Sequence, residues 1–217
     1  MTQFVEIPAT KNSLGHRRPI HGLGINDAWY MTQLKNPENG IRICPYYKVW
    51  KSMLERCYSA KYQERRPTYK GCSVSEEWLT FSNFRSWMEK QDWKGKCLDK
   101  DIIKIGNKIY SKDNCVFVSE KTNKLLNEYM AKRGDYPRGV SSKAGSSNYD
   151  ACCCVDGKNH RIGSFKNITD ASIAYLKFKS DLIVKIANED YKGINDRVMN
   201  GLISHANQLM LQIDCLR

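Results

Sequence analysis

The chain has 217 residues, of which 41% are hydrophobic and 11% aromatic, so it can bury a sizeable core and is not disordered throughout. No run approaches the roughly 18–20 apolar residues needed to cross a bilayer, and the N-terminal residues lack an apolar core of signal-peptide length. We therefore expect a soluble, cytoplasmic protein that contacts no membrane. The formal net charge of +12 at pH 7 favours a polyanionic partner.

This charge is unevenly distributed. Residues 41–134 carry 20 Lys/Arg against 11 Asp/Glu, residues 136–188 carry 8 against 4, and both ends are near neutral. Nucleic acid fits this bias better than a membrane surface, because no strongly basic amphipathic helix with a wide apolar face is present. The alternative is a basic but inert soluble protein.

Nine cysteines in a chain of this size without a secretion signal predict reduced thiols, several of them filling the core. We expect no zinc site, because the chain has no CxxC pair and only four histidines.

Residues 1–45 are rich in Gly, Pro and Asn and show little periodicity, which predicts an irregular arm with at most short strands. From residue 46 the pattern becomes helical, because Trp50, Met53, Leu54 and Cys57 repeat at i, i+3, i+4 and i+7. That repeat predicts one buried helix face.

The stretch "SEEWLTFSNFRSWMEK" predicts a second helix after a loop at "RRPTYKGC". Ser75 is the expected N-cap, and Trp78, Phe81 and Met88 are spaced for one helix face. Aromatic residues at this spacing are more often interior than base-stacking, so we expect Trp50 and Trp78 in the core.

A further helix is expected from about Ser119 to Tyr129, and the Gly and Pro of "MAKRGDYPRG" then mark a domain boundary. Three short strands follow, at "RGVSS", "YDACCCVD" and "HRIGSF", and then a helix from Thr169 to about Ala187. The last segment forms a helix with one apolar stripe, which either packs on the body or joins two subunits. The stripe consists of Val198, Leu202, Ala206, Leu209 and Ile213.

Residues 136–188 resemble the plant ethylene-response-factor (APETALA) DNA-binding domain. That family has an aromatic-Arg-Gly-Val start, a Trp-x-Ala-x-Ile strand, a Leu-Gly-x-Phe strand and a helix containing Ala-Ala-x-Ala-Tyr. The matching residues are Arg138, Gly139 and Val140, then Tyr149 and Ala151, then Ile162, Gly163 and Phe165, and finally Ala171, Ala174 and Tyr175.

This resemblance implies a three-stranded sheet that lies in the major groove of double-stranded DNA. Carried over by position, Arg138, Lys143, Tyr149 and Arg161 are the DNA-binding residues. Arginine suits guanine edges and lysine suits phosphates. Ser141 stands where the family has a second arginine, and Tyr149 replaces the usual Trp, so the resemblance implies DNA binding but does not carry over the family's sequence preference. The alternative is a small structural sheet with solvated basic residues.

The segment "CLDKDIIKIGNKIYSKDNCVFVSEKTN" is similar to the ββα-metal core of phage HNH homing endonucleases. In that family, Leu/Val-Asp-His ends the first strand, an Asn precedes the second strand, and an Asn or His lies on the following helix. Asp99, Asn114 and Asn123 occupy these positions, and Lys100 replaces the histidine. Phage HNH proteins often carry an ethylene-response-factor-like module after the nuclease, which implies action in an infected bacterial host.

The resemblance implies that Asp99 and Asn123 bind Mg²⁺, whose preferred ligands are oxygens. Asn114 would fix the loop through hydrogen bonds from its side chain to the backbone. Lys100 is a poor general base, because an unperturbed lysine keeps its proton at neutral pH.

Three interpretations of this segment stay open. Lys100 stabilises charge while solvent or another group activates water, which would give a slow or nicking enzyme. Alternatively, the site is silent and the fold serves as a DNA-binding platform. In the third interpretation, Asp99, Asp101 and Asn114 are only turn and cap residues, which these residue types favour.

Together these patterns predict an α+β protein with an arm at 1–45, an HNH-like ββα module with a helical lead-in at 46–130, a sheet module with one helix at 136–188, and a C-terminal helix at 189–217. The predicted function is Mg²⁺-dependent cleavage of double-stranded DNA. The alternative is a catalytically silent DNA-binding protein that acts as a regulator or inhibits a host enzyme, and a homodimer or a host protein partner fits either prediction.

Overall fold

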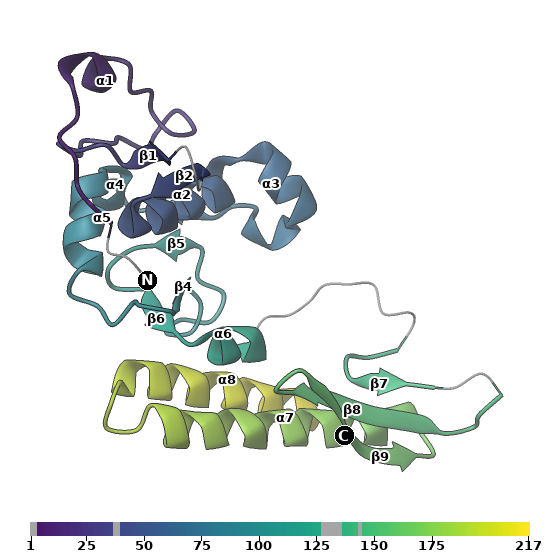
Figure 1. Ribbon diagram of the computed structural model, residues 1–217. Coiled ribbons are helices and arrows are strands. Elements are labelled where there is room, and N and C mark those ends of the chain that lie inside the picture. The colour runs from purple at the N-terminus through teal and green to yellow at the C-terminus, as the bar shows by residue number, and fades with distance from the viewer. Residues whose placement is uncertain (1–3, 37–39, 127–135, 143–144) are drawn as a thin grey trace. The chain divides into compact units, whose positions relative to one another are not determined.

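The computed structural model describes residues 4–36, 40–126, 136–142 and 145–217 (Figure 1). The fold is α+β, as predicted. The strands of the described residues form three two-stranded sheets and one three-stranded sheet. The chain divides into two compact units, the first made of residues 1–101 and 106–118 and the second of residues 102–105 and 119–217. The predicted module 46–130 therefore includes residues of both units, and the predicted module 136–188 lies within the second.

The first unit is built from helices with three small sheets. Its helices are α1 (Lys11–Gly15), α2 (Pro45–Tyr58), α3 (Ala60–Arg65), the short 3-10 helix η1 (Pro67–Tyr69), α4 (Glu76–Leu79) and α5 (Phe81–Met88). Its strands are β1 (Gln33–Asn36), β2 (Gly40–Ile43), β3 (Ser73–Val74), β4 (Cys97–Asp99), β5 (Ile109–Tyr110) and β6 (Val116–Val118). β1 pairs with β2 and β4 with β6 in antiparallel fashion, whereas β3 and β5 are parallel.

The core of the first unit is aromatic, and the predicted helix faces point into it. On α2, the predicted face of Trp50, Met53, Leu54 and Cys57 is buried. Trp78 is also buried, and its carbonyl oxygen accepts a hydrogen bond of 2.7 Å from Nε1 of Trp50. The prediction that both tryptophans are interior is confirmed.

The single helix expected after Ser75 is two helices, α4 and α5, separated at Thr80. The physical reason is a partner from the N-terminal arm. The amide of Ile25 donates to the carbonyl of Leu79, and the amide of Phe81 donates to the carbonyl of Ile25. These bonds hold Thr80 in an extended conformation (φ −92°, ψ 126°) and interrupt the helix.

The arm is more ordered than predicted, because its backbone is tied down by one half-buried arginine. The guanidinium of Arg17 donates hydrogen bonds to the carbonyls of Asn26, Ala28 and Tyr30. Ala28 and Tyr30 lie in the core with α2. Residues 1–45 thus complete the first unit.

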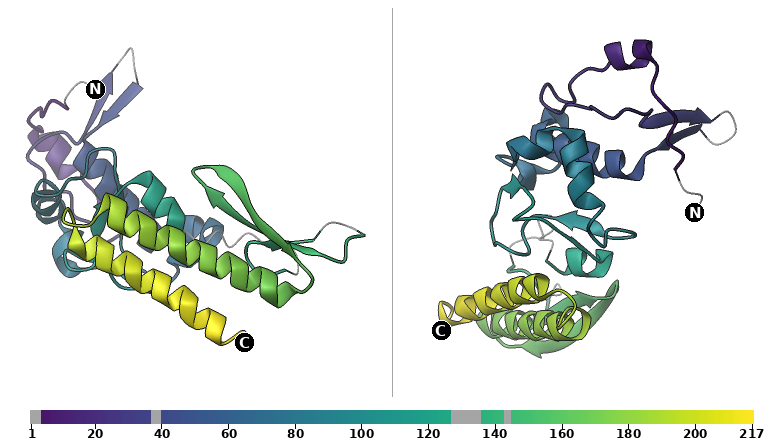
Figure 2. Two further views of the ribbon diagram at one scale, coloured as in Figure 1. Left: turned by 90° about the horizontal axis from the view of Figure 1, so that it is seen from below. Right: turned by 90° about the vertical axis from the view of Figure 1, so that its left-hand side faces the viewer.

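The second unit contains one sheet and three helices among the described residues (Figures 1 and 2). Its elements are α6 (Glu120–Leu126), β7 (Val140–Ser141), β8 (Tyr149–Val155), β9 (Lys158–Phe165), α7 (Ile168–Asp190) and α8 (Asp196–Asp214). The three predicted strands form an antiparallel sheet in the order β7, β8, β9, and α7 packs on it through Ala171 and Tyr175. The predicted strands and helix are therefore confirmed.

The apolar stripe of α8 packs within the unit, because α7 and α8 lie side by side (Figure 2). The hydroxyl of Ser180 on α7 donates to the carbonyl of Ala206 on α8 at 3.2 Å. Gly201 on α8 allows a close contact: a Cβ there would lie 2.3 Å from the carbonyl oxygen of Ile102. The buried Ile102 therefore requires glycine at this position.

Candidate nucleic-acid interface

Lys100 is held inside the loop between β4 and β5. Its side chain is only 6% exposed, and its Nζ donates to Oδ1 of Asp101 at 2.5 Å and to the carbonyl of Asn107 at 3.0 Å. The ammonium also lies 5.9 Å from the ring centre of Tyr110. These contacts direct the amine into the loop, where it stabilises the local structure.

Asn107 fixes this loop by side-chain hydrogen bonds. Its Nδ2 donates to the carbonyls of Lys100 and Ile109, both at 2.8 Å, and its Oδ1 accepts from the amide of Ile109 at 3.2 Å. Asn114, for which we predicted this role, makes one long side-chain bond of 3.5 Å to the carbonyl of Ile109. Sequence reasoning missed Asn107, although the turn signal "IGNK" preceding β5 marks it.

The predicted metal ligands belong to different units. Asp99 ends β4 in the first unit, where its Oδ1 accepts a 2.7 Å hydrogen bond from the amide of Asp101. Asn123 lies on α6 in the second unit. Within the described residues, no three His, Cys, Asp or Glu side chains are grouped as a metal site. Mg²⁺ binding by Asp99 and Asn123 stays a prediction.

The predicted DNA-binding residues of the sheet lie in different environments. Arg161 is exposed and forms an ion pair of 2.9 Å with Asp150. Tyr149 is half-buried against the sheet and helix core, and its ring contacts that of Tyr136. Arg138 lines a cavity beside α7, and Lys143 lies outside the described residues.

The face of the sheet that points away from α7 is nearly neutral. Asp150 pairs with Ser141 and Ser164 across the strands, and Cys152 pairs with Arg161, so these side chains share one face. Of these five described side chains, Arg161 carries the positive charge, and its ion pair with Asp150 neutralises that charge. This face alone supplies little attraction for phosphate.

A more basic surface lies on α3 and η1 of the first unit, and its backbone is well anchored. Ser59 caps α3 by accepting from the amide of Tyr62 at 3.3 Å, and α3 ends before Pro67, which disfavours helical conformation in the preceding residue. Nε2 of Gln63 donates to the carbonyl of Cys57 at 2.6 Å and, at 3.4 Å, to that of Tyr69. α3 is thereby tied to the end of α2 and to η1.

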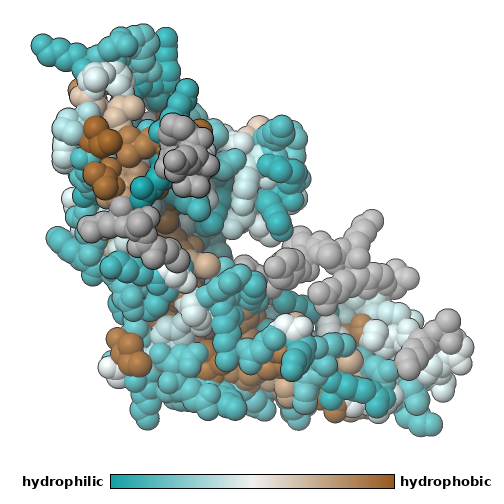
Figure 3. All heavy atoms as spheres, viewed as in Figure 1, coloured by the Kyte–Doolittle hydropathy of each residue, from teal (hydrophilic) through white to brown (hydrophobic). Residues whose placement is uncertain are grey.

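We call the exposed cations of this region the α3–η1 basic surface. They are Lys61, Arg65, Arg66, Lys70 and Lys108. Nζ of Lys108 donates to the carbonyl of Thr68 at 2.8 Å, which brings Lys108 next to η1. Glu64 is the acidic residue of α3, and Figure 3 shows hydrophilic side chains gathered over this helix. Sequence reasoning assigned "RRPTYKGC" only to a loop, although its basic residues were visible.

A half-buried cation, Arg56, contacts η1 of this surface. The guanidinium of Arg56 lies 5.7 Å from the ring centre of Tyr69. Burial lowers the pKa of Arg56, but the neighbouring phenols of Tyr110 and Tyr69 outweigh that effect and raise it, so the side chain stays charged. Burial also raises the pKa of the nearby Cys57 thiol to about 12, which keeps this core cysteine protonated at neutral pH.

Comparison of the chain with protein-family models, curated proteins and solved structures finds no match. In the described part of the chain, no helix has the length and apolar character needed to cross a membrane.

Proposed function

We propose that the protein binds double-stranded DNA and that its α3–η1 basic surface contacts the phosphate backbone. The observation that carries this proposal is a group of five exposed cations, four of them within residues 61–70 of the anchored α3–η1 segment and the fifth, Lys108, hydrogen-bonded to Thr68 beside it, with a single glutamate on the helix. Lysine and arginine bind DNA largely through phosphates and by displacing condensed counterions, and such contacts do not require a base-reading element.

The sheet module adds a second contact in this proposal. Its resemblance to the ethylene-response-factor domain supports a role for Arg138, Lys143, Tyr149 and Arg161 in reading the duplex. The Asp150–Arg161 ion pair would open on binding, since phosphate can replace the carboxylate as the partner of the arginine. We expect this contact to contribute more to orientation than to affinity, because the sheet face is nearly neutral.

The first test compares two charge-matched double variants in duplex binding. Arg66→Gln with Lys70→Gln removes two cations from the basic surface, and we expect the affinity for a 20-bp duplex to fall about 10-fold or more, as fits the loss of two phosphate contacts. Fluorescence anisotropy at fixed, moderate salt measures this change.

The control is Lys11→Gln with Lys35→Gln, which removes two exposed lysines from the arm of the same unit. Its affinity should stay within about 2-fold of the unsubstituted protein. An equal loss in both double variants would show that net charge matters and the α3–η1 basic surface does not.

The second candidate function is DNA cleavage by an HNH-like site. The observation that favours it is the order of the elements: an antiparallel pair, β4 and β6, precedes helix α6, and Asp99, Asn114 and Asn123 follow one another in that order. Asp99 and Asn123 would hold Mg²⁺, which would stabilise charge on the scissile phosphate. Lys100 would not serve as the base, since its amine is bonded to Asp101 and Asn107.

We favour the non-cleaving function for this reason and predict no nicking of supercoiled plasmid with Mg²⁺ or Mn²⁺ at large protein excess. Gel mobility of the plasmid under conditions that saturate binding provides the measurement. Nicking that is lost in Asp99→Ala and in Asn123→Ala would contradict this prediction and establish the nuclease. Such a result would leave the binding test unaffected.

A further inference from the structure

The second unit contains two neighbouring cavities of about 700 and 580 Å³, sizes that are typical of small-molecule sites. They share four lining residues, Leu125, Arg138, Tyr175 and Lys179. Neither cavity includes a residue of the α3–η1 basic surface, but both include Arg138, which the proposed duplex contact of the sheet module also uses.

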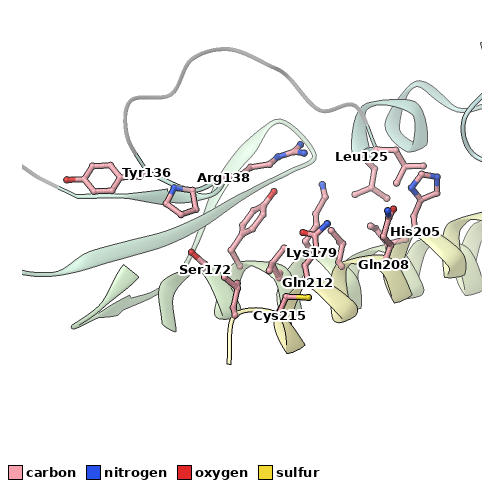
Figure 4. A pocket seen from close by; sticks show the side chains of 16 residues that line it. Leu125, Tyr136, Arg138, Ser172, Lys179, His205, Gln208, Gln212 and Cys215 are labelled. Atoms are coloured by element: carbon pink, nitrogen blue, oxygen red, sulfur yellow. The ribbon is translucent and has the colours of Figure 1, made fainter. Parts of the chain in front are cut away.

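Lys179 is the unusual residue of these cavities. It belongs to α7, it is 8% exposed, and no hydrogen-bond or ion-pair partner for it occurs among the described residues. In Figure 4 its side chain extends from α7 toward that of Arg138, which comes from the turn before β7. The side chain of Lys179 is largely buried, so its ammonium is partly desolvated at the cavity wall, and an anion between these two cations would offset that cost.

The surroundings of Lys179 are mainly apolar. The larger cavity is lined by Leu125, Leu176, Ile183 and Leu209, from three helices. The pKa of Lys179 is lowered, mainly because the side chain is buried. The Cys153 thiol raises this pKa, and the positive charge of Arg138 lowers it. A bound anion would therefore contact the cationic groups of Lys179 and Arg138 and the aliphatic side chains of the cavity wall.

The donors present indicate the kind of anion. Two cationic side chains match the two oxygens of one carboxylate. A dianionic phosphate would be matched better by further cationic side chains, whereas Gln208 and Gln212 in the wall of the larger cavity are neutral. The hydroxyl of Ser172 already donates to the carbonyl of Ile168 at 2.8 Å. The aliphatic wall matches an alkyl chain better than a sugar or a nucleotide.

We propose that this cavity binds a small amphipathic carboxylate, with its head group between Lys179 and Arg138 and its alkyl chain along α7 and α8. Charge complementarity favours a carboxylate head group, and the leucine and isoleucine side chains favour an alkyl tail on the ligand.

Calorimetric titration of the full-length protein with decanoate, below its micelle concentration, tests this proposal. We expect saturable binding, with decanol and inorganic phosphate each binding at least 10-fold more weakly. Lys179→Met keeps the length of the side chain and removes its charge, and decanoate affinity should fall at least 10-fold. The matched control is Lys177→Met, an exposed position on the same helix, which should leave the affinity unchanged.

Thermal unfolding of Lys179→Met gives a readout of folding, and we expect it to be at least as stable as the unsubstituted protein. If this variant fails to fold, Arg138→Gln provides the second test, because Arg138 is exposed and its loss should still weaken decanoate binding severalfold. Absence of saturable decanoate binding, equal binding of decanol, or unchanged affinity in the folded Lys179 variant would each overturn the proposal.

Discussion

Lys100 and Asn107 close the loop between β4 and β5 by reciprocal bonds, since each side chain donates to the other's carbonyl. Asn107→Ala would remove this exchange together with the bonds to Ile109, and would leave buried backbone groups without partners. We expect a loss of about 2–3 kcal/mol in the free energy of unfolding. Urea unfolding followed by tryptophan fluorescence measures this loss.

Asn114→Ala is the natural control, because its side chain makes only one long bond. Its effect should be about 0.5 kcal/mol or less. If the two variants lost equal stability, the loop would depend on Asn114 as the family resemblance implied.

The roles of these two asparagines could not be distinguished from the sequence. Both residues lie beside a turn, and only the structure shows that Asn107 is buried.

Elements with a strong local pattern could be predicted from the sequence, and elements shaped by distant partners could not. The apolar face of α2 and the strands and helix of the sheet module follow from periodicity, because each has one continuous buried face. The break between α4 and α5 depends on Ile25, which reaches Thr80 only in the folded chain. No spacing within residues 75–88 indicates that break.

The candidate sites show the same division. The positive charge of residues 41–134 was countable, but its concentration on α3 and η1 depends on how Gln63 and Pro67 shape that segment. The cavity around Lys179 could not be predicted. A lysine in a helix is expected to be exposed, and its burial depends on how the neighbouring elements pack against that helix.

At the scale of the whole molecule, DNA binding through phosphate contacts by this protein of net charge +12 makes a quantitative prediction about salt. Each phosphate contact by a lysine or arginine releases condensed counterions, so the logarithm of the binding constant falls with the logarithm of salt concentration by about 0.9 per contact. We expect steep weakening of duplex binding between low and moderate salt. Anisotropy titrations at four or five salt concentrations give the slope.

The slope separates local contacts from the general field of the protein. Arg66→Gln with Lys70→Gln should reduce its magnitude by about 1.8 if both side chains contact phosphates, since each contact contributes about 0.9. Lys11→Gln with Lys35→Gln lowers the net charge by the same two units and should leave the slope nearly unchanged, because a weaker general attraction releases no fewer bound counterions. A flat salt dependence for the unsubstituted protein would contradict the assignment of DNA as the partner, and equal slopes for all three proteins would move the phosphate contacts away from α3 and η1.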